Sequence, residues 1–540
     1  MNKVIIFCTI FLLSFKIQVF SQADKSDWEG GVPDGCTTIT AGKLATTDGS
    51  VITSHTDDSH RTRSEISITP PLKYGKGAVS NMYKRVACDS FAMPTYSNIK
   101  IGTIPQIENT FGFINSAYPC MNTRQLGIGE STFGGRDELQ SDAGLIDCQR
   151  LCQLMLERCT NARDAIKLAG ELTKKYGWND YGECLTIADK NEVWHFEIVG
   201  PGKGLTGSVW VAQRVPDGEV SVNANASRIR KIDLKNTDFF MASDNIYEVA
   251  KQHNWWNETM GDFEFCYAYA PESRKSIASR RREWRVLDMI APSLKLDPYD
   301  ENYPFSVKPD KKLELQDIVT IFKDYYEGTP YDMTRTVLAP DKDGKMQISP
   351  LANPFLPYDQ LAITNVSGGW YHTDSKSGKI DFLGERTIAR WYTMYATIIQ
   401  LRNWLPDAVG GVTWLAMDNV ATSIYIPVYG GTTDLPEPYK VPGRTNGYTT
   451  KSAWWAFNRL GTLTAQRWGD MRKDVDAVWV PWQKELFDNQ HEFEKQALLI
   501  KDDKKQQAFL TAYTFQWGNK VITKAWDLGD FLWTKYDEKF

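Results

Sequence analysis

The stretch CTTITAGKLATTDGSVITSHTDD (residues 36–58) carries the pattern that decides the fold. Two runs rich in Thr, Ile and Val, residues 37–41 and 50–54, flank a Thr-Asp-Gly tripeptide at 47–49, which is a strong turn signal. The stretch therefore predicts a β-hairpin. Cys36 opens the first strand of this hairpin and follows directly on a polar segment rich in Gly, Pro and Asp.

Beyond the hairpin, blocks with strand character alternate with blocks of helical periodicity. Strands are expected near 99–133, over 184–230, near 361–383 and over 411–429, and helices over 142–177, 246–255, 275–290, 313–326, 385–404 and 452–540. Asn161 followed by Asp164 is typical of a helix start. No repeat of 20–50 residues is visible, which argues against a propeller or solenoid. The alternation predicts a layered α+β protein.

Length and composition narrow the functional classes. The chain has 540 residues, which at about 150 residues per domain suggests three or four domain-sized units. Hydrophobic residues make up 42% and charged residues 24%, so disorder is not expected. The formal charge is -5, and the one dense basic cluster, residues 280–282, is isolated, so we expect no nucleic-acid partner. The 19 Trp, 24 Tyr and 24 Phe suit large cores, clefts or sugar-binding surfaces.

The first 21 residues are predicted to be a secretory signal peptide. Lys3 supplies the positive charge, residues 4–15 are almost continuously apolar, and the small residues Val19 and Ser21 precede a cleavage point. The apolar run is shorter than the roughly 20 residues that a spanning helix needs. We therefore expect an exported protein, periplasmic or extracellular, without stable membrane insertion once the signal is removed. Residues 22–35 then read as a linker or pro-segment.

The cysteines suggest disulfides at first sight. Nine are present; Cys8 leaves with the signal, and the other eight would meet an oxidising compartment. Cys148 and Cys152 share one helical face, where small buried hydrophobes are the expected reading. No CxxC pair exists, and none of the six His lies in an HExxH pattern, so no metal site or cofactor is predicted.

Cys36 is the foremost candidate for chemistry. Cleavage between Gly35 and Cys36 would leave a thiol and a free α-amine on one residue. The amine titrates near about 8 and the thiol near about 8.5, so the amine can act as the general base of an activated nucleophile. Such a residue needs no catalytic His. For an arbitrary cysteine, a buried thiol or half of a disulfide would be the ordinary interpretation.

Several segments, in the same order, resemble the cysteine dipeptidases of the N-terminal-nucleophile (Ntn) hydrolase class, the secernin/dipeptidase family. They are residues 36–50, LGIGESTFGGR at 126–136, parts of 181–197, RVPD and NANASRI within 214–229, and SAWWAFN at 452–458. The resemblance covers roughly 36–460 and implies a four-layer αββα sandwich of antiparallel sheets with helical insertions. It implies one peptidase domain over 36–460, followed by a helical C-terminal extension over 461–540.

The resemblance also implies roles for single residues. Cys36 would be the nucleophile, exposed by autocatalytic removal of the segment that ends at Gly35, and would stay a free thiol. Asp58 would hydrogen-bond the terminal amine, with Asp57 as the alternative. Asn225 would help to bind the oxyanion, where a fixed N–H donor stabilises the tetrahedral intermediate, with Asn223 as the alternative.

One position departs from the family pattern. Relatives usually carry Arg three residues before the Asp, and this chain has His55. Arginine is always charged and forked, whereas His is neither. His55 can still donate to a substrate carbonyl or hold the thiolate, and it also fits altered specificity or reduced activity.

Further substrate-binding candidates are charged. Arg386, with Arg390 as its neighbour, matches a later Arg that contacts the site in related acylases. Glu130, Glu183 and Arg136 lie in the family-like segments, where they would meet the charged ends of a dipeptide or form ion pairs within the fold.

The resulting hypothesis is hydrolysis of dipeptides or other short peptides without metal or cofactor. One alternative is an Ntn acylase or amidase that cuts N-acyl amino acids. A second is a non-enzymatic glycan-binding protein that presents Trp454, Trp455, Trp479 and Trp482, although their apolar context favours core packing. The sequence leaves open whether the protein forms a homo-oligomer.

Overall fold

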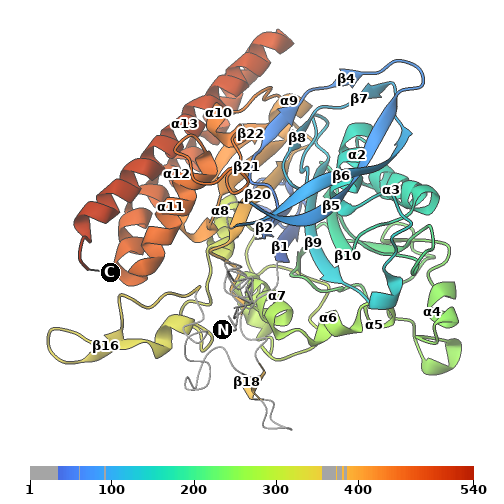
Figure 1. Cartoon of the computed structure of the whole chain (residues 1–540), viewed down its shortest axis with the longest axis horizontal. Coiled ribbons are helices and arrows are strands. Elements are labelled where there is room, and N and C mark those ends of the chain that lie inside the picture. The colour runs from blue at the N-terminus through green and yellow to red at the C-terminus, as the bar shows by residue number, and fades with distance from the viewer. Residues whose placement is uncertain are drawn as a thin grey trace, which may run out of the picture.

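A computed structural model describes residues 35–59, 61–90, 93–355, 372–373, 380–381 and 386–539. The expected signal peptide, residues 1–21, and the expected pro-segment up to residue 34 lie outside these ranges. Within them, helices alternate with antiparallel sheets, which confirms the α+β prediction. Figure 1 shows the sheets at the centre of the molecule and helices on either side.

The predicted hairpin is present. Strand β1 (Gly35–Ala41) pairs antiparallel with β2 (Val51–Asp58), and every residue of both strands is buried. Gly49 in the turn has φ of 84°, a conformation that glycine adopts without strain. The register sets Cys36 opposite Asp57 and Gly35 opposite Asp58.

The hairpin forms the middle of a seven-stranded antiparallel sheet. The strand order is β15 (Ser306–Val307), β13 (Val220–Asn223), β1, β2, β20 (Thr393–Leu401), β21 (Val412–Met417) and β22 (Ile426–Tyr429). The helix expected over 385–404 is wrong, because its second half is β20. All nine residues of β20 are buried, and a strand buried on both faces reads as a continuous apolar run that periodicity cannot separate from a buried helix.

A second, five-stranded antiparallel sheet faces the first. Its order is β14 (Phe240–Ala242), β12 (Val209–Arg214), β11 (Val193–Val199), β10 (Gly182–Ala188) and β9 (Gly127–Gly134). The hydroxyls of Thr53 and Thr186 meet between the sheets at 2.7 Å. A Cβ atom at Gly129 would lie 2.3 Å from the backbone oxygen of Ser54, so this close approach requires glycine.

Helices lie on both sides of the two sheets (Figure 1). On one side lie α2 (Cys148–Arg158) and α3 (Ala162–Tyr176), and the side chain of Asn161 caps α3 as expected. On the other side lie α11 (Ala453–Gln466), α12 (Trp468–Leu499) and α13 (Asp503–Lys535) (Figure 1). The expected domain boundary at 460 falls inside α11. Trp454 and Trp479 are fully buried, as core packing predicts.

The remaining helices and strands lie in connections. They are β3 (Ser67–Thr69), β4 (Leu72–Lys73), β5 (Val79–Ser90), β6 (Met93–Pro105), β7 (Asn109–Thr110), β8 (Phe113–Asn115), α4 (Glu248–Gln252), α5 (Phe265–Tyr269), α6 (Pro271–Lys275), α7 (Ile277–Ile290), α8 (Leu315–Phe322), β16 (Leu338–Pro340), β17 (Met346–Ile348), β18 (His372–Thr373), β19 (Ile380–Asp381), α9 (Asp407–Gly410) and α10 (Glu437–Lys440). Most of the strand region expected near 361–383 lies outside the described residues.

Two further observations concern the whole described part of the chain. Its eight cysteines are all free thiols, and seven of them are buried. None of its helices combines the length and the apolar character that crossing a membrane would require.

Candidate active site

Cys36 lies at the wall of a cavity of about 810 Å³. Its side chain is almost completely buried, because it opens a central strand. The hairpin of β5 and β6, strand β10 and the loops beside them complete the wall, with Arg85, Tyr96, Tyr118, Asp147, Asp180 and Glu183 among the lining residues. Many of these side chains are charged, so the cavity offers both carboxylates and cations to a small polar molecule.

The thiol of Cys36 points at a carboxylate. Its Sγ donates to Oε2 of Glu130 at 3.2 Å, and the same oxygen lies 3.2 Å from Nε2 of His55. Burial, and then the charge of Glu130, raise the pKa of the thiol well above its ordinary value. Burial opposes ionisation of Glu130, but the neighbouring imidazole of His55 outweighs it and lowers the pKa of Glu130 to about 2. The site therefore holds a protonated thiol beside an ionised proton acceptor.

A second carboxyl group, that of Glu183, lies close to Glu130. The hydroxyl of Thr132 lies 3.0 Å from Oε1 of Glu130 and 2.9 Å from Oε1 of Glu183. Burial, followed by the charge of Glu130, raises the pKa of Glu183 well above its usual range. Glu183 thus keeps its proton while Glu130 stays ionised, the expected outcome for two carboxyl groups that share one buried site.

Asn225 contacts the backbone of Cys36. Its Oδ1 accepts a hydrogen bond from the Cys36 nitrogen at 2.9 Å, and its Nδ2 donates to the Thr132 carbonyl at 2.6 Å. Its φ of 62° turns the loop so that its own nitrogen donates to Ser131 Oγ at 2.9 Å. The alternative Asn223 points into its own loop, where it donates to the Ala226 carbonyl at 2.8 Å.

Asp58 is buried at the far end of β2. It accepts from Nη2 of Arg386 at 2.7 Å and from Thr393 Oγ1 at 2.6 Å. Asp57, opposite Cys36 in the register, accepts from Thr62 Oγ1 at 2.7 Å. The structure brings Asp58 and Arg386 together as a buried ion pair near the strand end. The hydrogen bond between Asp58 and the terminal amine of Cys36 stays a prediction.

Two other candidates occupy different surroundings. The guanidinium of Arg390 lies 4.7 Å from the ring centroid of Tyr392. Arg136 donates to the Ala268 carbonyl at 2.7 Å and is not among the residues that line the cavity. Arg136 therefore stabilises a connection rather than the neighbourhood of Cys36.

Sequence reasoning missed Arg282. From α7, its Nη1 donates to the Cys36 carbonyl at 2.8 Å, and its Nη2 donates to Oδ1 of Asn225 at 2.8 Å. Burial lowers the pKa of Arg282 to about 9, with a further contribution from the charge of Arg386. Its only sequence signal is the basic cluster at 280–282. In the structure Arg281 and Arg282 are fully buried and Arg280 is half-buried, and the sequence alone does not distinguish them.

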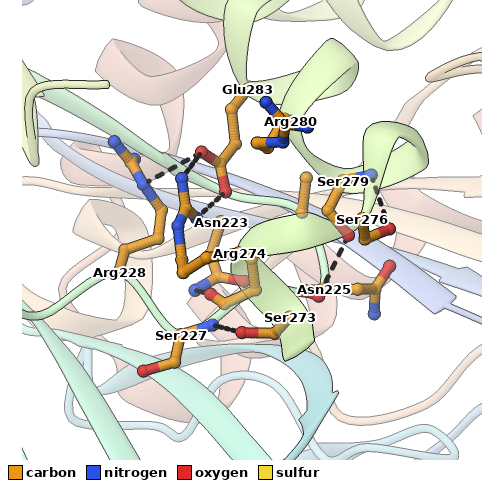
Figure 2. Close-up of polar contacts among 12 residues, drawn as sticks. Asn223, Asn225, Ser227, Arg228, Ser273, Arg274, Ser276, Ser279, Arg280 and Glu283 are labelled. Atoms are coloured by element: carbon orange, nitrogen blue, oxygen red, sulfur yellow. Dashed lines mark hydrogen bonds and ion pairs between the residues drawn. The ribbon is translucent and has the colours of Figure 1, made fainter. Parts of the chain in front are cut away.

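The segment around Asn225 is tied to α6 and α7, as Figure 2 shows. Ser279 Oγ donates to the Asn225 carbonyl at 3.1 Å, and the Ser227 nitrogen donates to Ser273 Oγ at 3.1 Å. Glu283 lies between Arg274, at 2.9 Å, and Arg228, at 3.5 Å. Burial opposes ionisation of Glu283, but these arginines lower its pKa. The buried ion cluster thus anchors the helix that carries Arg282.

Comparison with known proteins identifies the family of this chain. Residues 35–480 match peptidase family C69, and the chain belongs to that family. It is therefore a hydrolase of peptide bonds. The resemblance inferred from the sequence motifs is confirmed.

Relatives cover most of the chain at modest identity. A probable dipeptidase of Latilactobacillus sakei is 26% identical over 456 residues, 82% of this chain and 83% of that protein. A probable dipeptidase B of Streptococcus pyogenes serotype M1 is 23% identical over 465 residues, again 82% and 83%. Dipeptidase A of Lactobacillus helveticus is 22% identical over 441 residues, 80% of this chain and 81% of that protein.

Proposed function

We propose that this protein is an exported cysteine dipeptidase whose nucleophile, Cys36, becomes N-terminal by autoprocessing. The observation that carries the proposal is the 3.2 Å contact between Cys36 Sγ and Glu130 Oε2. Cys36 follows Gly35 directly and lies at the wall of the cavity. The names of the relatives support dipeptides as substrates. Two facing antiparallel sheets with helices on their outer sides support the four-layer αββα sandwich of Ntn hydrolases.

Processing begins from the precursor, in which the Cys36 nitrogen is still a peptide nitrogen. Glu130 accepts the thiol proton, and the sulfur attacks the Gly35 carbonyl carbon. The C–N bond then breaks, the nitrogen takes up the proton and becomes the free amine, and Gly35 is held as a thioester. Water hydrolyses the thioester, which releases the upstream segment as a carboxylate and frees the thiol.

The mature enzyme repeats this chemistry on a peptide. The amine of Cys36 accepts the thiol proton, the sulfur attacks the scissile carbonyl, and the proton passes to the departing amine. Water then hydrolyses the acyl-enzyme. In the precursor the Nδ2 group of Asn225 is engaged by the Thr132 carbonyl. Its predicted oxyanion role therefore requires this group to turn towards the substrate.

The charged cavity favours a zwitterionic substrate over a fatty or aromatic acyl group. Arg85 pairs with Asp180 at 2.7 Å and lies 3.6 Å from Asp147, while Lys84 and Lys203 also line the wall. A dipeptide brings one ammonium and one carboxylate, which this mixture can match. The glycan-binding alternative loses its support, because Trp454 and Trp479 are buried and Trp455 and Trp482 are partly buried against the core rather than displayed as a platform.

The test combines intact mass with substrate profiling. The full chain should yield a mature protein that begins at Cys36 and cleaves dipeptides in preference to N-acyl amino acids. Cys36→Ala should keep the upstream segment and lose activity, whereas Cys88→Ala, which removes an exposed thiol, should behave as wild type. A mature protein that begins near residue 22, or an active Cys36→Ala variant, would overturn the proposal. Cell fractionation tests export.

A further inference from the structure

Three different donor atoms converge beside the cavity. They are Sγ of Cys36 on β1, Nε2 of His55 on β2 and Oε2 of Glu130 on β9, and all lie within 4.8 Å of one another. Glu130 Oε2 is 3.2 Å from each of the other two. All three side chains are buried, and they come from both sheets. The packing of the sheets therefore prearranges the donors.

The imidazole of His55 is available as a ligand. Its Nδ1 has no hydrogen-bonding partner among the described residues, and its Nε2 approaches Glu130 without hydrogen-bond geometry. Its ring lies edge-on to Tyr118 and Tyr395, with centroids 5.5 and 5.7 Å away, so aromatic packing holds its orientation. Nε2 is ion-paired with the Glu130 carboxylate, which would be its fellow ligand, and an unbonded Nδ1 is unusual in a buried imidazole, since buried polar groups are normally paired.

The donor set matches a zinc ion. Thiolate, imidazole and carboxylate are the protein ligands of Zn²⁺, and tetrahedral bonds of about 2.0–2.3 Å place neighbouring ligand atoms about 3.3–3.6 Å apart. Two of the separations are 3.2 Å and the third, between Sγ and Nε2, is at most 4.8 Å, so small side-chain shifts bring all three to that spacing. Of the three donors, Cys36 lines the cavity, so we expect the fourth ligand, water or the α-amine of the processed chain, on the side of the sulfur.

We propose that Cys36, His55 and Glu130 form an inhibitory zinc site in which the metal ligates the nucleophilic sulfur. On binding, the thiol releases its proton to water and the thiolate bonds the metal, so the sulfur cannot attack a peptide until zinc is withdrawn. An arginine at position 55 could not serve as a ligand, because its guanidinium is always protonated and has no acceptor atom. Metal binding at this site therefore depends on the histidine at position 55.

Metal binding is measured without substrate on each purified chain as it is isolated, with its N-terminus defined by intact mass. Zn²⁺ is titrated from a buffered chelator, and Co²⁺ serves as a spectroscopic probe of thiolate ligation. We expect one zinc per chain and a sulfur-to-cobalt charge-transfer band. His55→Arg should weaken zinc binding by at least about tenfold, and Cys36→Ser should abolish the band. Cys88→Ser, which lacks the exposed thiol, should bind like wild type.

Thermal melting of each variant checks its folding, and His55→Gln replaces His55→Arg if the latter does not fold. Equal zinc affinity in wild type and in the folded position-55 variant would overturn the inference, as would no zinc binding by wild type. The inhibitory consequence rests on the proposed function, but the binding readout does not. An inactive protein that binds zinc through His55 would overturn the dipeptidase and leave the metal site standing.

Discussion

Arg282 in helix α7 donates a 2.8 Å hydrogen bond to the backbone carbonyl of Cys36, 246 residues earlier in the chain. The other nitrogen of its fork holds the Asn225 side chain at 2.8 Å. One guanidinium therefore positions both the strand that carries the nucleophile and the loop that contacts its nitrogen. This links a helical connection directly to the geometry of the reacting sulfur.

Replacing Arg282 should loosen the contact between the strand that carries Cys36 and the loop that carries Asn225. Arg282→Lys keeps the charge but loses the planar fork, so one of the two segments is released. We expect kcat/KM to fall by about a hundredfold, because small displacements at a reacting centre have effects of that size. The matched control is Arg280→Lys. In the described part of the chain the Arg280 side chain donates to the backbone carbonyls of Tyr299 and Asp300, away from Cys36. Equal losses in both variants would contradict the positioning role.

Gly35 should be required for processing. A Cβ atom at this position would lie 2.3 Å from Oδ1 of Asn225, closer than nonbonded atoms can approach. Gly35→Ala should displace Asn225 or the strand, and the unprocessed chain should accumulate in a time course of intact mass. Gly75→Ala introduces the same change where no atom lies within 4 Å, and it should process normally. Normal processing of Gly35→Ala would show that the precursor tolerates the shift.

We expect the Glu130→Gln variant to process more slowly than the Glu183→Gln variant. Glutamine keeps the shape but removes the ionised acceptor, and loss of a positioned general base costs about 10²–10⁴-fold in rate. Because the pKa of Glu130 is about 2, its base form is present throughout the neutral range. Glu183→Gln is the comparison, since the raised pKa of Glu183 already keeps that group neutral. Processing rates by mass spectrometry should rank the two variants, and the opposite ranking would exclude Glu130 as the acceptor.

The titration of the buried Glu197 carboxyl group should make the free energy of unfolding depend on pH. Burial raises its pKa from 4.5 to about 7, although Arg228 N, Ser227 Oγ and Ile229 N donate hydrogen bonds to it. Between these values the folded chain binds a proton that the unfolded chain releases. The free energy of unfolding therefore falls as pH rises through this window, by on the order of 3 kcal/mol from this group, and this loss stays constant above the window.

Glu197→Gln removes the titration and can keep the contacts. The Gln oxygen can accept from the two backbone nitrogens that bond Oε1, and its NH₂ group can donate to Ser227 Oγ. Denaturant melts at a series of pH values should show a smaller fall in stability between about pH 4.5 and 7 than in wild type. Parallel curves for the two proteins would mean that Glu197 titrates normally.

Local patterns in the sequence were sufficient for much of this protein. The tripeptide at 47–49 predicted the hairpin, and Asn161 marked the start of α3. The ordered motifs over 36–460 predicted the family. These features depend on neighbouring residues or on motif order, so they are visible in one dimension. The same local reading was wrong for β20, because an apolar run buried on both faces carries no period that distinguishes strand from helix.

The sequence by itself determined the first hairpin, the family and the position of Cys36 at a strand start. Only the tertiary structure decided which charged groups meet that residue. Glu130 reaches the thiol because the edge strand β9 packs against β1, and Arg282 reaches its carbonyl because α7 turns one face inward. Such contacts join residues 94 and 246 positions apart. The physical reason is that sheet packing and burial choose the partners of a side chain, and neither is encoded by its neighbours along the chain.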